Sequence, residues 1–226
     1  MKLFIGSKNY STWSMRPWVV LTQAGIPFEE KPLDFADPGF KAEVKRISPS
    51  SLVPVLVDGD LVVWDSLAIV EYLADRFADR NLWPADVAAR AVARSLCCEM
   101  HAGFQTMRGA LTMNFQLRLP GAGWNVKVQK DIDRIVAMWD DARARFGSGG
   151  PYLFGSFCIA DAFFAPVAQR FLGYGVKLPA GAKAYVDTLA AMQAFQKWAE
   201  SARKETSFYP PDEPYRLAPD VPPGDR

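Results

Sequence analysis

Hydrophobic and polar positions follow two different periods, one in the first third of the chain and another in the remainder. In the first third, short runs rich in β-branched and aromatic residues alternate with stretches whose apolar residues recur every three to four positions. The short runs predict strands, and the longer periodic stretches predict helices. We therefore expect strands at residues 2–5, 28–33, 54–57 and 61–64, and helices at residues 16–24, 37–46 and 65–77.

This order of elements, βαβαββα, indicates how the strands pair. A helix between the first two strands requires a crossover, which favours a parallel pair. Asp58-Gly59 between the last two runs is a strong hairpin signal, although Asp60 can lengthen the loop. Pro54 cannot donate a hydrogen bond to a neighbouring strand, so it predicts either an edge position or a special turn.

After residues 79–86, where Pro84 marks a linker, only helical periodicity recurs. One stretch is so apolar that we expect it at the centre of a helical domain. The prolines after residue 207 predict an extended strap or a disordered end. The expected helices are 87–115, kinked near Gly103 or Gly109, then 127–146, 159–171 (the apolar stretch), 183–189 and 192–204. The predicted organisation is an α/β domain at residues 1–78, a linker at 79–86, and an all-helical domain at 87–226 with a proline-rich tail from about residue 207.

Composition limits the partners and the location of the protein. Half of the 226 residues are hydrophobic, which is enough for a sizeable core, and the 26 basic and 25 acidic residues nearly cancel. This balance gives no electrostatic basis for binding nucleic acid or an anionic membrane. No apolar run reaches about 18 residues, and the N-terminus turns polar too early for a signal peptide. We therefore expect a soluble, cytoplasmic protein.

The three cysteines and the single histidine argue against a metal or disulfide site. Cys97, Cys98 and Cys158 form no CxxC pair, and neighbouring cysteines cannot both face one site on a helix. We expect all three to be small buried residues. His101 alone leaves no histidine-rich metal site and excludes most Ser-His-Asp arrangements that do not use it. No metal is therefore expected.

The candidate chemistry begins in the stretch GSKNYSTWSMRPWVVL, residues 6–21. A strand ends at its start and a helix begins within it, and the polar loop between them carries Ser7, Ser11, Thr12 and Ser14. Free backbone N–H groups, the positive end of a helix and hydroxyl groups together suit an anion or a thiolate. The same residue types are also typical of a helix cap with no other role.

Four short segments, in this order along the chain, resemble the cytosolic glutathione S-transferases. They are the opening stretch, SLVPVL at residues 51–56, DSLAIVEYL at 65–73 and FGSFCIADAFFAP at 154–166. The serines of the opening stretch are similar to those of the serine-type members, which include bacterial, zeta-, theta- and tau-like proteins. The resemblance implies a thioredoxin-like βαβαββα domain followed by an all-helical domain, with glutathione as co-substrate and no metal.

The resemblance also implies roles for two serines. The active hydroxyl of the serine-type classes lies five residues before an arginine that begins the apolar run of the helix. Counting back from Arg16 gives Ser11, which would donate a hydrogen bond to the glutathione sulfur and favour the thiolate. Ser14 would cap the helix and bind glutathione as a second hydroxyl.

Further glutathione contacts follow from the second and third segments. Val53, which precedes a cis Pro54 in the family pattern, would hold the cysteinyl part of glutathione through its backbone. Asp65 and Ser66 begin a helix, and they would bind the γ-glutamyl ammonium and carboxylate respectively. The alternative for this pair is a simple helix cap. Candidates for the glycyl carboxylate are Lys41, Lys45 and Arg46.

The second substrate would lie between Trp13 and the long helix at residues 87–115. Phe104 belongs to an apolar stripe at helical spacing, and His101 and Arg108 lie on an adjoining stripe. One interpretation is an apolar pocket with a cation for an anionic substrate. The other is ordinary helix packing beside a solvated arginine. The residues expected to close such a pocket are Phe171, Tyr174 and those near Phe208.

Three hypotheses about function remain open. The leading one is a glutathione transferase that acts on a small hydrophobic electrophile, and the resemblance implies a homodimer. A glutathione-dependent isomerase of the zeta type is the second, because VDGDLVVWDSLAIVEYL, residues 57–73, is similar to the matching zeta segment. Against it, residues 11–14 read STWS and lack the zeta pattern of paired serines followed by cysteine. The third is a non-catalytic module that binds glutathione or another ligand on the same fold.

Overall fold

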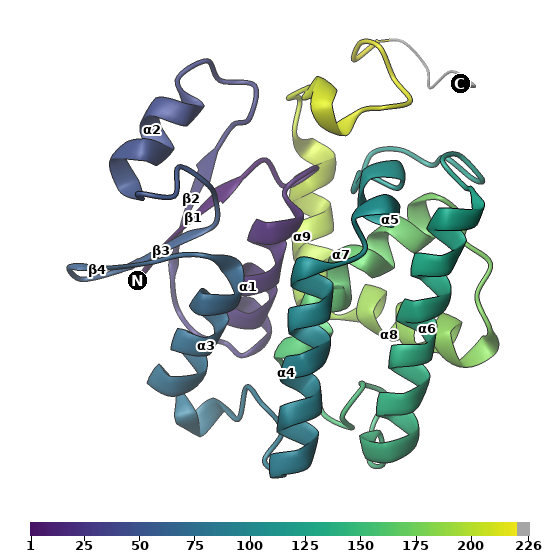
Figure 1. Cartoon of the computed structure of the whole chain (residues 1–226). Helices are drawn as coiled ribbons and strands as arrows, with labels where there is room; N and C mark the ends of the chain where they lie inside the picture. The colour runs from purple at the N-terminus through teal and green to yellow at the C-terminus, as the bar shows by residue number, and fades with distance from the viewer. Residues whose placement is uncertain (221–226) are drawn as a thin grey trace.

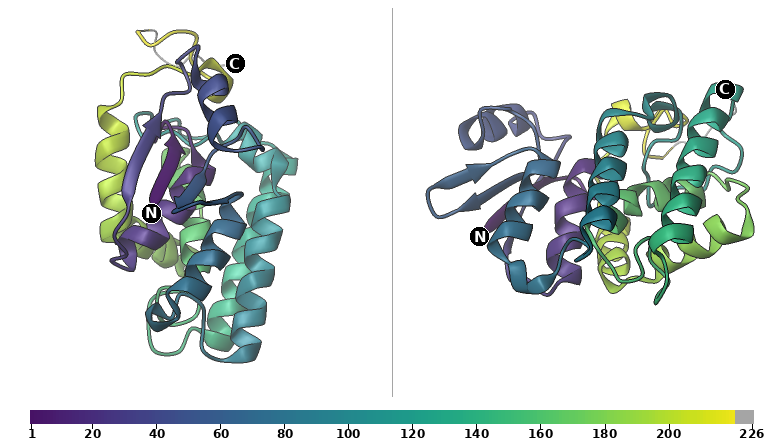
Figure 2. Two further views of the ribbon diagram at one scale, coloured as in Figure 1. Left: turned by 90° about the vertical axis from the view of Figure 1, so that its left-hand side faces the viewer. Right: turned by 60° about the horizontal axis from the view of Figure 1, so that its bottom comes forward.

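The computed structural model describes residues 1–220, which form two lobes packed side by side (Figures 1 and 2). One lobe holds a four-stranded sheet and three helices, and the other is built from helices. This is the predicted fold class: a thioredoxin-like βαβαββα unit followed by an all-helical part. Within residues 1–220, no helix is long and apolar enough to cross a membrane, and no cluster of three His, Cys, Asp or Glu side chains could hold a metal ion.

A single mixed sheet forms the centre of the first lobe. Its strands are β1 (Lys2–Gly6), β2 (Glu29–Leu33), β3 (Val55–Asp58) and β4 (Leu61–Val63), in the order β2-β1-β3-β4. The pairing of β1 with β2 is parallel, as predicted, and β3 is antiparallel to both of its neighbours. Asp58 pairs with Leu61, so the hairpin loop consists of Gly59 and Asp60. Gly59 has a φ of 60°, a conformation that glycine adopts without strain.

Helix α1 begins four residues earlier than predicted. The helices of this lobe are α1 (Thr12–Gln23), α2 (Phe40–Ile47) and α3 (Ser66–Arg76). The prediction assigned Pro17 to the first helical turn, whereas Pro17 lies inside α1 and Ser11 is the N-cap. The loop between β1 and α1 is therefore only residues 7–11.

The single long helix predicted at residues 87–115 is wrong. Two helices, α4 (Val87–Ala102) and α5 (Gln105–Ala110), replace it, and the break lies at Gly103, near one of the two expected kinks. Phe104 has a φ of 58°, which ends the helical path, and a Cβ at Gly103 would lie 2.8 Å from the Glu99 carbonyl oxygen. The other helices are α6 (Val126–Phe146), α7 (Ile159–Gly173), α8 (Ala180–Ala191) and α9 (Gln193–Lys204), with 3-10 turns at Ala78–Arg80 and Pro210–Asp212.

Helices α1 and α7 meet where the two lobes join. Every residue of α1 from Ser14 to Leu21 is buried, and α7 is buried from Ile159 to Phe171, as its apolar sequence predicts. The two helices pack against each other, and α9 also packs on α1. Because α1 is enclosed by both lobes, the residues at its N-terminus have a fixed position between them.

The segment predicted as a linker, residues 79–86, is packed against both lobes. Leu82 and Trp83 are buried, and the Leu82 carbonyl accepts a hydrogen bond from the N–H of Ile159, at 2.9 Å. The Trp83 indole N–H donates to Glu71 of α3, at 3.3 Å. The predicted domain limits at residues 78 and 87 stay a prediction.

The tail forms a strap rather than a disordered end as far as residue 220. It leaves α9 at Glu205 and crosses the top of the molecule in the view of Figure 1, with one 3-10 turn at Pro210–Asp212. The part of the predicted tail at residues 221–226 lies outside the described residues.

The expectation that all three cysteines are buried is wrong for one of them. Cys97 and Cys158 are buried, whereas Cys98 is exposed. Cys97 and Cys98 are neighbours on α4, where consecutive side chains point to different sides of the helix.

Candidate functional site

A cavity of about 780 Å³ opens between the two lobes at the N-terminus of α1. The sheet lobe contributes the loop before α1, helix α2 and the residues before β3, while the helical lobe contributes α5, α7 and the strap. A smaller pocket of about 190 Å³ adjoins it at the start of α3. The residues that line both are Trp13, Ser50, Leu52 and Val53.

Ser11, the predicted donor to the glutathione sulfur, lines the larger cavity. It is the N-cap residue of α1, and it donates a hydrogen bond to Ser14 Oγ at 2.7 Å. Ser14 has no exposed surface, and its Oγ also accepts the N–H of Gly6 at 3.1 Å. The prediction that Ser14 caps the helix is wrong, because α1 begins at Thr12. Ser14 also has no surface through which it could bind glutathione directly.

The residues before β3 bring free backbone groups to the same cavity. The peptide bond between Val53 and Pro54 is cis, as predicted, and Val53 lines both the cavity and the smaller pocket. Pairing between β3 and β1 begins at Val55, so the N–H and C=O groups of Val53 are not used by the sheet. An extended peptide in the cavity can pair with these groups as an added strand.

The start of α3 forms one wall of the smaller pocket. Ser66 lines it, is 1% exposed, and has a buried Oγ without a hydrogen-bond partner among residues 1–220. Asp65 is the N-cap, and its Oδ1 accepts the N–H of Leu67 at 3.0 Å. Its Oδ2 lies 2.6 Å from His101 Nε2, so part of this carboxylate is already occupied. An orphaned hydroxyl at a helix N-terminus suits a carboxylate ligand.

Three of the four residues predicted for the second substrate line these cavities. Trp13 lines both, Arg108 lines the larger and His101 lines the smaller. Phe104 lines neither, and it packs into the core at the break between α4 and α5. Among the candidates for the glycyl carboxylate, Lys41 and Lys45 line the larger cavity, whereas Arg46 does not and pairs with Glu43.

The architecture and these segments match known proteins. The family model for the N-terminal domain of glutathione S-transferases matches residues 10–76. Glutathione S-transferase 3 of Zea mays is 30% identical over 194 residues, which cover 81% of this chain and 86% of that protein. The chain belongs to the glutathione S-transferase family.

Two other proteins, one from a nematode and one from a bacterium, are also similar to this chain. A probable maleylacetoacetate isomerase of Caenorhabditis elegans is 33% identical over 102 residues, covering 43% of this chain and 48% of that protein. A glutathione transferase homolog from Burkholderia, solved with bound glutathione, is 25% identical. It superposes with a TM-score of 0.69 and covers 90% of this chain and 98% of its own.

In this glutathione S-transferase the strap closes one side of the cavity, as expected for the residues near Phe208. Tyr209 and Asp212 of the strap line the cavity, whereas Phe208, beside which we expected the closing residue, does not. Phe171, also expected there, is buried in the core, and Tyr174 lines a separate pocket beside α6. Proline-rich composition predicts an extended path but not what the path covers.

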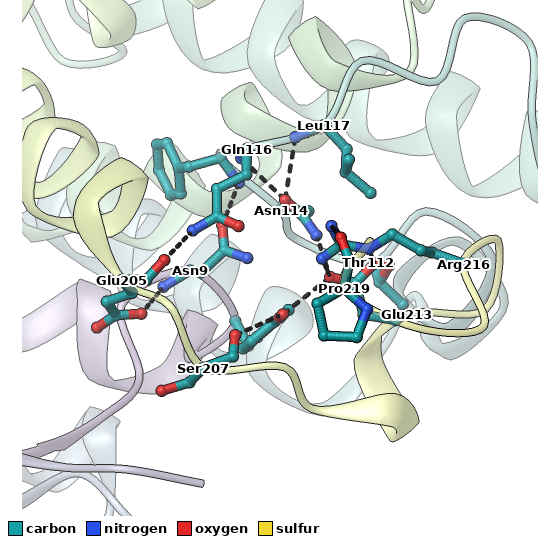
Figure 3. Close-up of polar contacts among 12 residues, drawn as sticks. Asn9, Thr112, Asn114, Gln116, Leu117, Glu205, Ser207, Glu213, Arg216 and Pro219 are labelled. Atoms are coloured by element: carbon teal, nitrogen blue, oxygen red, sulfur yellow. Dashed lines mark hydrogen bonds and ion pairs between the residues drawn. The ribbon is translucent and has the colours of Figure 1, made fainter. Parts of the chain in front are cut away.

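The first anchor of the strap is Glu205 (Figure 3). Its two carboxylate oxygens accept the N–H groups of Lys8, at 2.7 Å, and Asn9, at 2.9 Å. Burial raises the pKa of this carboxyl, although both N–H groups act in the opposite direction. Glu205 therefore joins the end of α9 to the loop that precedes α1.

The second anchor is Glu213, a carboxylate that is only 4% exposed. It accepts the side-chain N–H of Asn114 at 2.9 Å and pairs with Arg216 at 2.5 Å, as Figure 3 shows. It also accepts the hydroxyl of Tyr10 at 2.8 Å. Burial and this carboxylate raise the pKa of Tyr10 to about 12. Although Tyr10 lines the cavity, its hydroxyl proton is therefore committed to the strap.

Arg170 is a further cavity residue that the sequence analysis missed. It lies near the end of α7, is 5% exposed and lines the larger cavity. A usable signal was present, because Arg170 and Asp161 are the only charged residues in an otherwise strongly apolar stretch at residues 159–171. Asp161 is accounted for by the helix start, so the unexplained charge was Arg170.

Proposed function

We propose that this chain is a glutathione transferase in which Ser11 stabilises the thiolate of bound glutathione. The observation that carries the proposal is the position of Ser11, a cavity-lining hydroxyl at the N-cap of α1. Membership of the glutathione S-transferase family supports the same function. The electrophile would occupy the part of the cavity formed by α5, α7 and the strap.

In the proposed complex, glutathione lies along the sheet lobe. Its γ-glutamyl carboxylate meets the orphaned Ser66 hydroxyl at the start of α3, and its ammonium group meets Asp65. Its cysteinyl backbone pairs with the free backbone groups of Val53. Its glycyl carboxylate extends toward Lys41 and Lys45 of α2. This arrangement directs the sulfur to Ser11.

Ser14 supports Ser11 from inside the helix. A hydroxyl is both a donor and an acceptor, so the bonded pair can exchange roles by rotation about the C–O bonds. The N–H of Gly6 already donates to Ser14 Oγ, which leaves the Ser14 proton free to turn to Ser11. Ser11 then donates its own proton to the sulfur. Ser14 is a positioning residue in this scheme and does not touch glutathione.

The interactions available at Ser11 are sufficient to activate a thiol. Lowering a thiol pKa by about two units requires about 2.7 kcal/mol. A hydrogen bond to a charged group contributes about 1.5–3 kcal/mol, and a helix N-terminus adds about 0.3–1 kcal/mol. The sulfur then forms a bond to an electrophilic carbon, and the electrons of the broken bond depart with the leaving group. The thiol proton goes to solvent, so this scheme uses no general base.

The test replaces Ser11 with alanine. Because about 1.5–3 kcal/mol of thiolate stabilisation is lost, Ser11→Ala should lower turnover of a neutral model electrophile about 10- to 100-fold. Glutathione binding, measured by calorimetry, should stay close to wild type. Ser95→Ala is the matched control, because Ser95 is exposed on α4 and bonds only to the Ala91 carbonyl. Wild-type turnover in Ser11→Ala would contradict the proposal that Ser11 stabilises the glutathione thiolate.

The zeta-type isomerase is the second candidate, favoured by the similarity to the probable maleylacetoacetate isomerase. In an isomerase, the thiolate adds to an activated cis double bond and leaves again after rotation, so glutathione is not consumed. Net consumption of glutathione with an aryl halide distinguishes the transferase from it. Failure of the wild type to bind glutathione would instead favour a ligand-binding module.

We also propose that two copies form a homodimer through the sheet lobe. Large apolar side chains are exposed on this lobe at Leu52 (70%), Leu61 (48%) and Trp64 (43%). Leu61 lies on β4, the edge strand of the sheet, and the other two line the pocket at the start of α3. A partner surface over this edge would cover all three and help to order the glutathione pocket.

A further inference from the structure

The cavity wall opposite the sheet lobe is rich in positive charge. Arg108 of α5 and Arg170 of α7 line it, and Lys41 and Lys45 of α2 add two cations on the sheet-lobe side of the cavity. Asp212 of the strap is the one acidic residue in the lining. The net charge of the chain is only +1, so this excess of cations is local to the cavity.

The two arginines have spare hydrogen-bond donors. Seven other arginines form ion pairs within residues 1–220, but Arg108 and Arg170 form none there. Arg108 donates from Nη1 to the His101 carbonyl at 3.2 Å. Arg170 also uses Nη1, to the carbonyls of Leu111 and Arg108. A guanidinium carries five N–H donors, so most donors of each remain for a ligand.

Burial makes these charges costly without an anion. Arg170 is 5% exposed and Arg108 is half-buried. Burial lowers the pKa of Arg170 to about 10 and lowers that of Arg108 as well, because the charged form loses hydration. Trp13 of α1 lies beside Arg108, with its ring centre 5.0 Å from the Arg108 guanidinium carbon. A bound anion would offset the lost hydration, and the ring offers an apolar surface beside it.

The carboxylates of glutathione do not account for this cluster. In the proposed complex they lie at Ser66 and at the α2 lysines, both on the sheet lobe. The arginines come from the helical lobe, where the second substrate binds. We propose, resting on the transferase function above, that the electrophile carries a carboxylate or similar anionic group bound by Arg108 and Arg170, with its apolar body against Trp13 and Met113.

The test uses a matched pair of electrophiles, 4-chloro-3,5-dinitrobenzoate and its methyl ester. In both, the glutathione sulfur forms a bond to the carbon that carries chlorine, the C–Cl bond breaks, and chloride leaves with the electron pair. The acid carries the anion and the ester lacks it. Because the para ester activates the reacting carbon more than the para carboxylate does, each kcat/KM in this comparison is divided by the rate constant of the uncatalysed reaction of that electrophile with glutathione. Wild-type kcat/KM, corrected in this way, should favour the acid by about tenfold or more, equivalent to about 1.4 kcal/mol.

Variants at Arg108 test whether this residue is the source of the preference for the acid over the ester. Arg108→Gln should reduce the ratio of acid to ester kcat/KM about tenfold, and Arg108→Lys should retain part of it because the charge remains. Arg118→Gln, which removes an exposed arginine outside the cavity, should keep the wild-type ratio. Thermal unfolding of each variant establishes that it is folded, and the ratio within one variant is independent of how much protein is active.

Three outcomes would overturn the inference or its basis. Equal kcat/KM for acid and ester in the wild type would contradict the proposal that the electrophile carries an anionic group. A raised KM for glutathione in Arg108→Gln with an unchanged acid-to-ester ratio would assign Arg108 to a carboxylate of glutathione. Turnover of neither electrophile, in a protein that binds glutathione, would count against the transferase function itself and not against the arginine cluster alone.

Discussion

Arg16 is a charged side chain that the fold holds in the interior without an anion. It is 1% exposed, and its Nε and Nη1 have no hydrogen-bond partner among the described residues. Its guanidinium carbon lies 3.9 Å from the ring centre of Trp13 and 4.8 Å from that of Phe163. Burial lowers its pKa well below the ordinary value, and the charges of Arg108 and Arg170 act in the same direction. Such a charge is a cost to folding, and we infer that its benefit lies in attracting the anions of the reaction.

This inference predicts opposite effects of Arg16→Met on stability and on the thiolate. Methionine fills similar space without a buried charge, so the free energy of unfolding should stay within about 1 kcal/mol of wild type or rise. The apparent pKa of glutathione in the complex, read from the pH profile of turnover, should increase because a nearby positive charge is lost.

Arg134→Met is the matched control, since it removes an exposed arginine that pairs with Glu99. A loss of several kcal/mol of stability in Arg16→Met, with an unchanged pH profile, would make Arg16 a structural residue instead.

The serines of the opening stretch show what can be predicted for single residues. Counting back from Arg16 selected Ser11, which lines the cavity. The predicted helix start is wrong because proline is typical of the first helical turn, whereas Pro17 lies inside α1. A start near Arg16 makes Ser14 the predicted cap, although Ser14 is a buried partner of Ser11. The spacing between Ser11 and Arg16 is enough to recognise the motif, whereas the path of the backbone through Pro17 depends on packing.

Among the elements, α7 was predicted well and α4 was not. The apolar run at residues 159–171 has one interpretation, a buried helix. The run at residues 87–115 keeps helical spacing through Gly103, so periodicity alone does not reveal the break there. Glycine is compatible both with a continued helix and with a stop, and the contacts of Phe104 decide between them.

The N-terminus of α7 depends on a carboxylate that folding buries completely. Asp161 accepts the N–H groups of Cys158, at 2.8 Å, and Leu153, at 3.2 Å, and the hydroxyl of Tyr185, at 2.9 Å. Burial nevertheless raises its pKa from 3.8 to about 6. The folded state therefore binds a proton at this site at a higher pH than the unfolded chain does.

A defined pH dependence follows for Asp161. A raised folded-state pKa adds stability that is complete below pH 3.8 and is lost as the pH rises through about 6. The free energy of unfolding of the wild type, minus that of Asp161→Asn, should therefore grow on acidification from pH 7 to 4, by up to about 3 kcal/mol at 1.36 kcal/mol per pKa unit. Urea unfolding at several pH values measures this difference, in which the carboxylates common to both proteins cancel. A difference that shrinks instead would mean that the hydrogen bonds outweigh burial.

At the scale of the whole molecule, the two-part organisation was predictable and the contacts between distant segments were not. The period of the hydrophobic pattern changes along the chain where the first lobe ends and the second begins. Glu205 and Lys8 lie 197 residues apart, and neither has a sequence pattern that links it to the other. Local periodicity contains no information about such pairs, so the contacts that anchor the strap required the structure.

The proposed homodimer gives a test at the same scale. Leu61→Glu places a charge on the exposed edge strand, where a partner surface would have to bury it. The variant should elute as a monomer, with its mass measured by light scattering, whereas the wild type should have twice that mass.

Leu217→Glu is the matched control, because Leu217 is 72% exposed but lies on the strap, away from the proposed interface. A dimer that persists in Leu61→Glu would exclude β4 from the interface.

The strap also has a consequence for the order in which the site is completed during synthesis. Ser11, the turn at Val53 and both arginines are all translated before Tyr209 and Asp212, which close the cavity. A nascent chain that has emerged only as far as α9 has the proposed thiolate donor but lacks the last wall and the Glu213 anchor. The loop before α1 therefore receives its final restraints only after every other cavity-lining residue has been made, so a ribosome-bound intermediate should be open at this side.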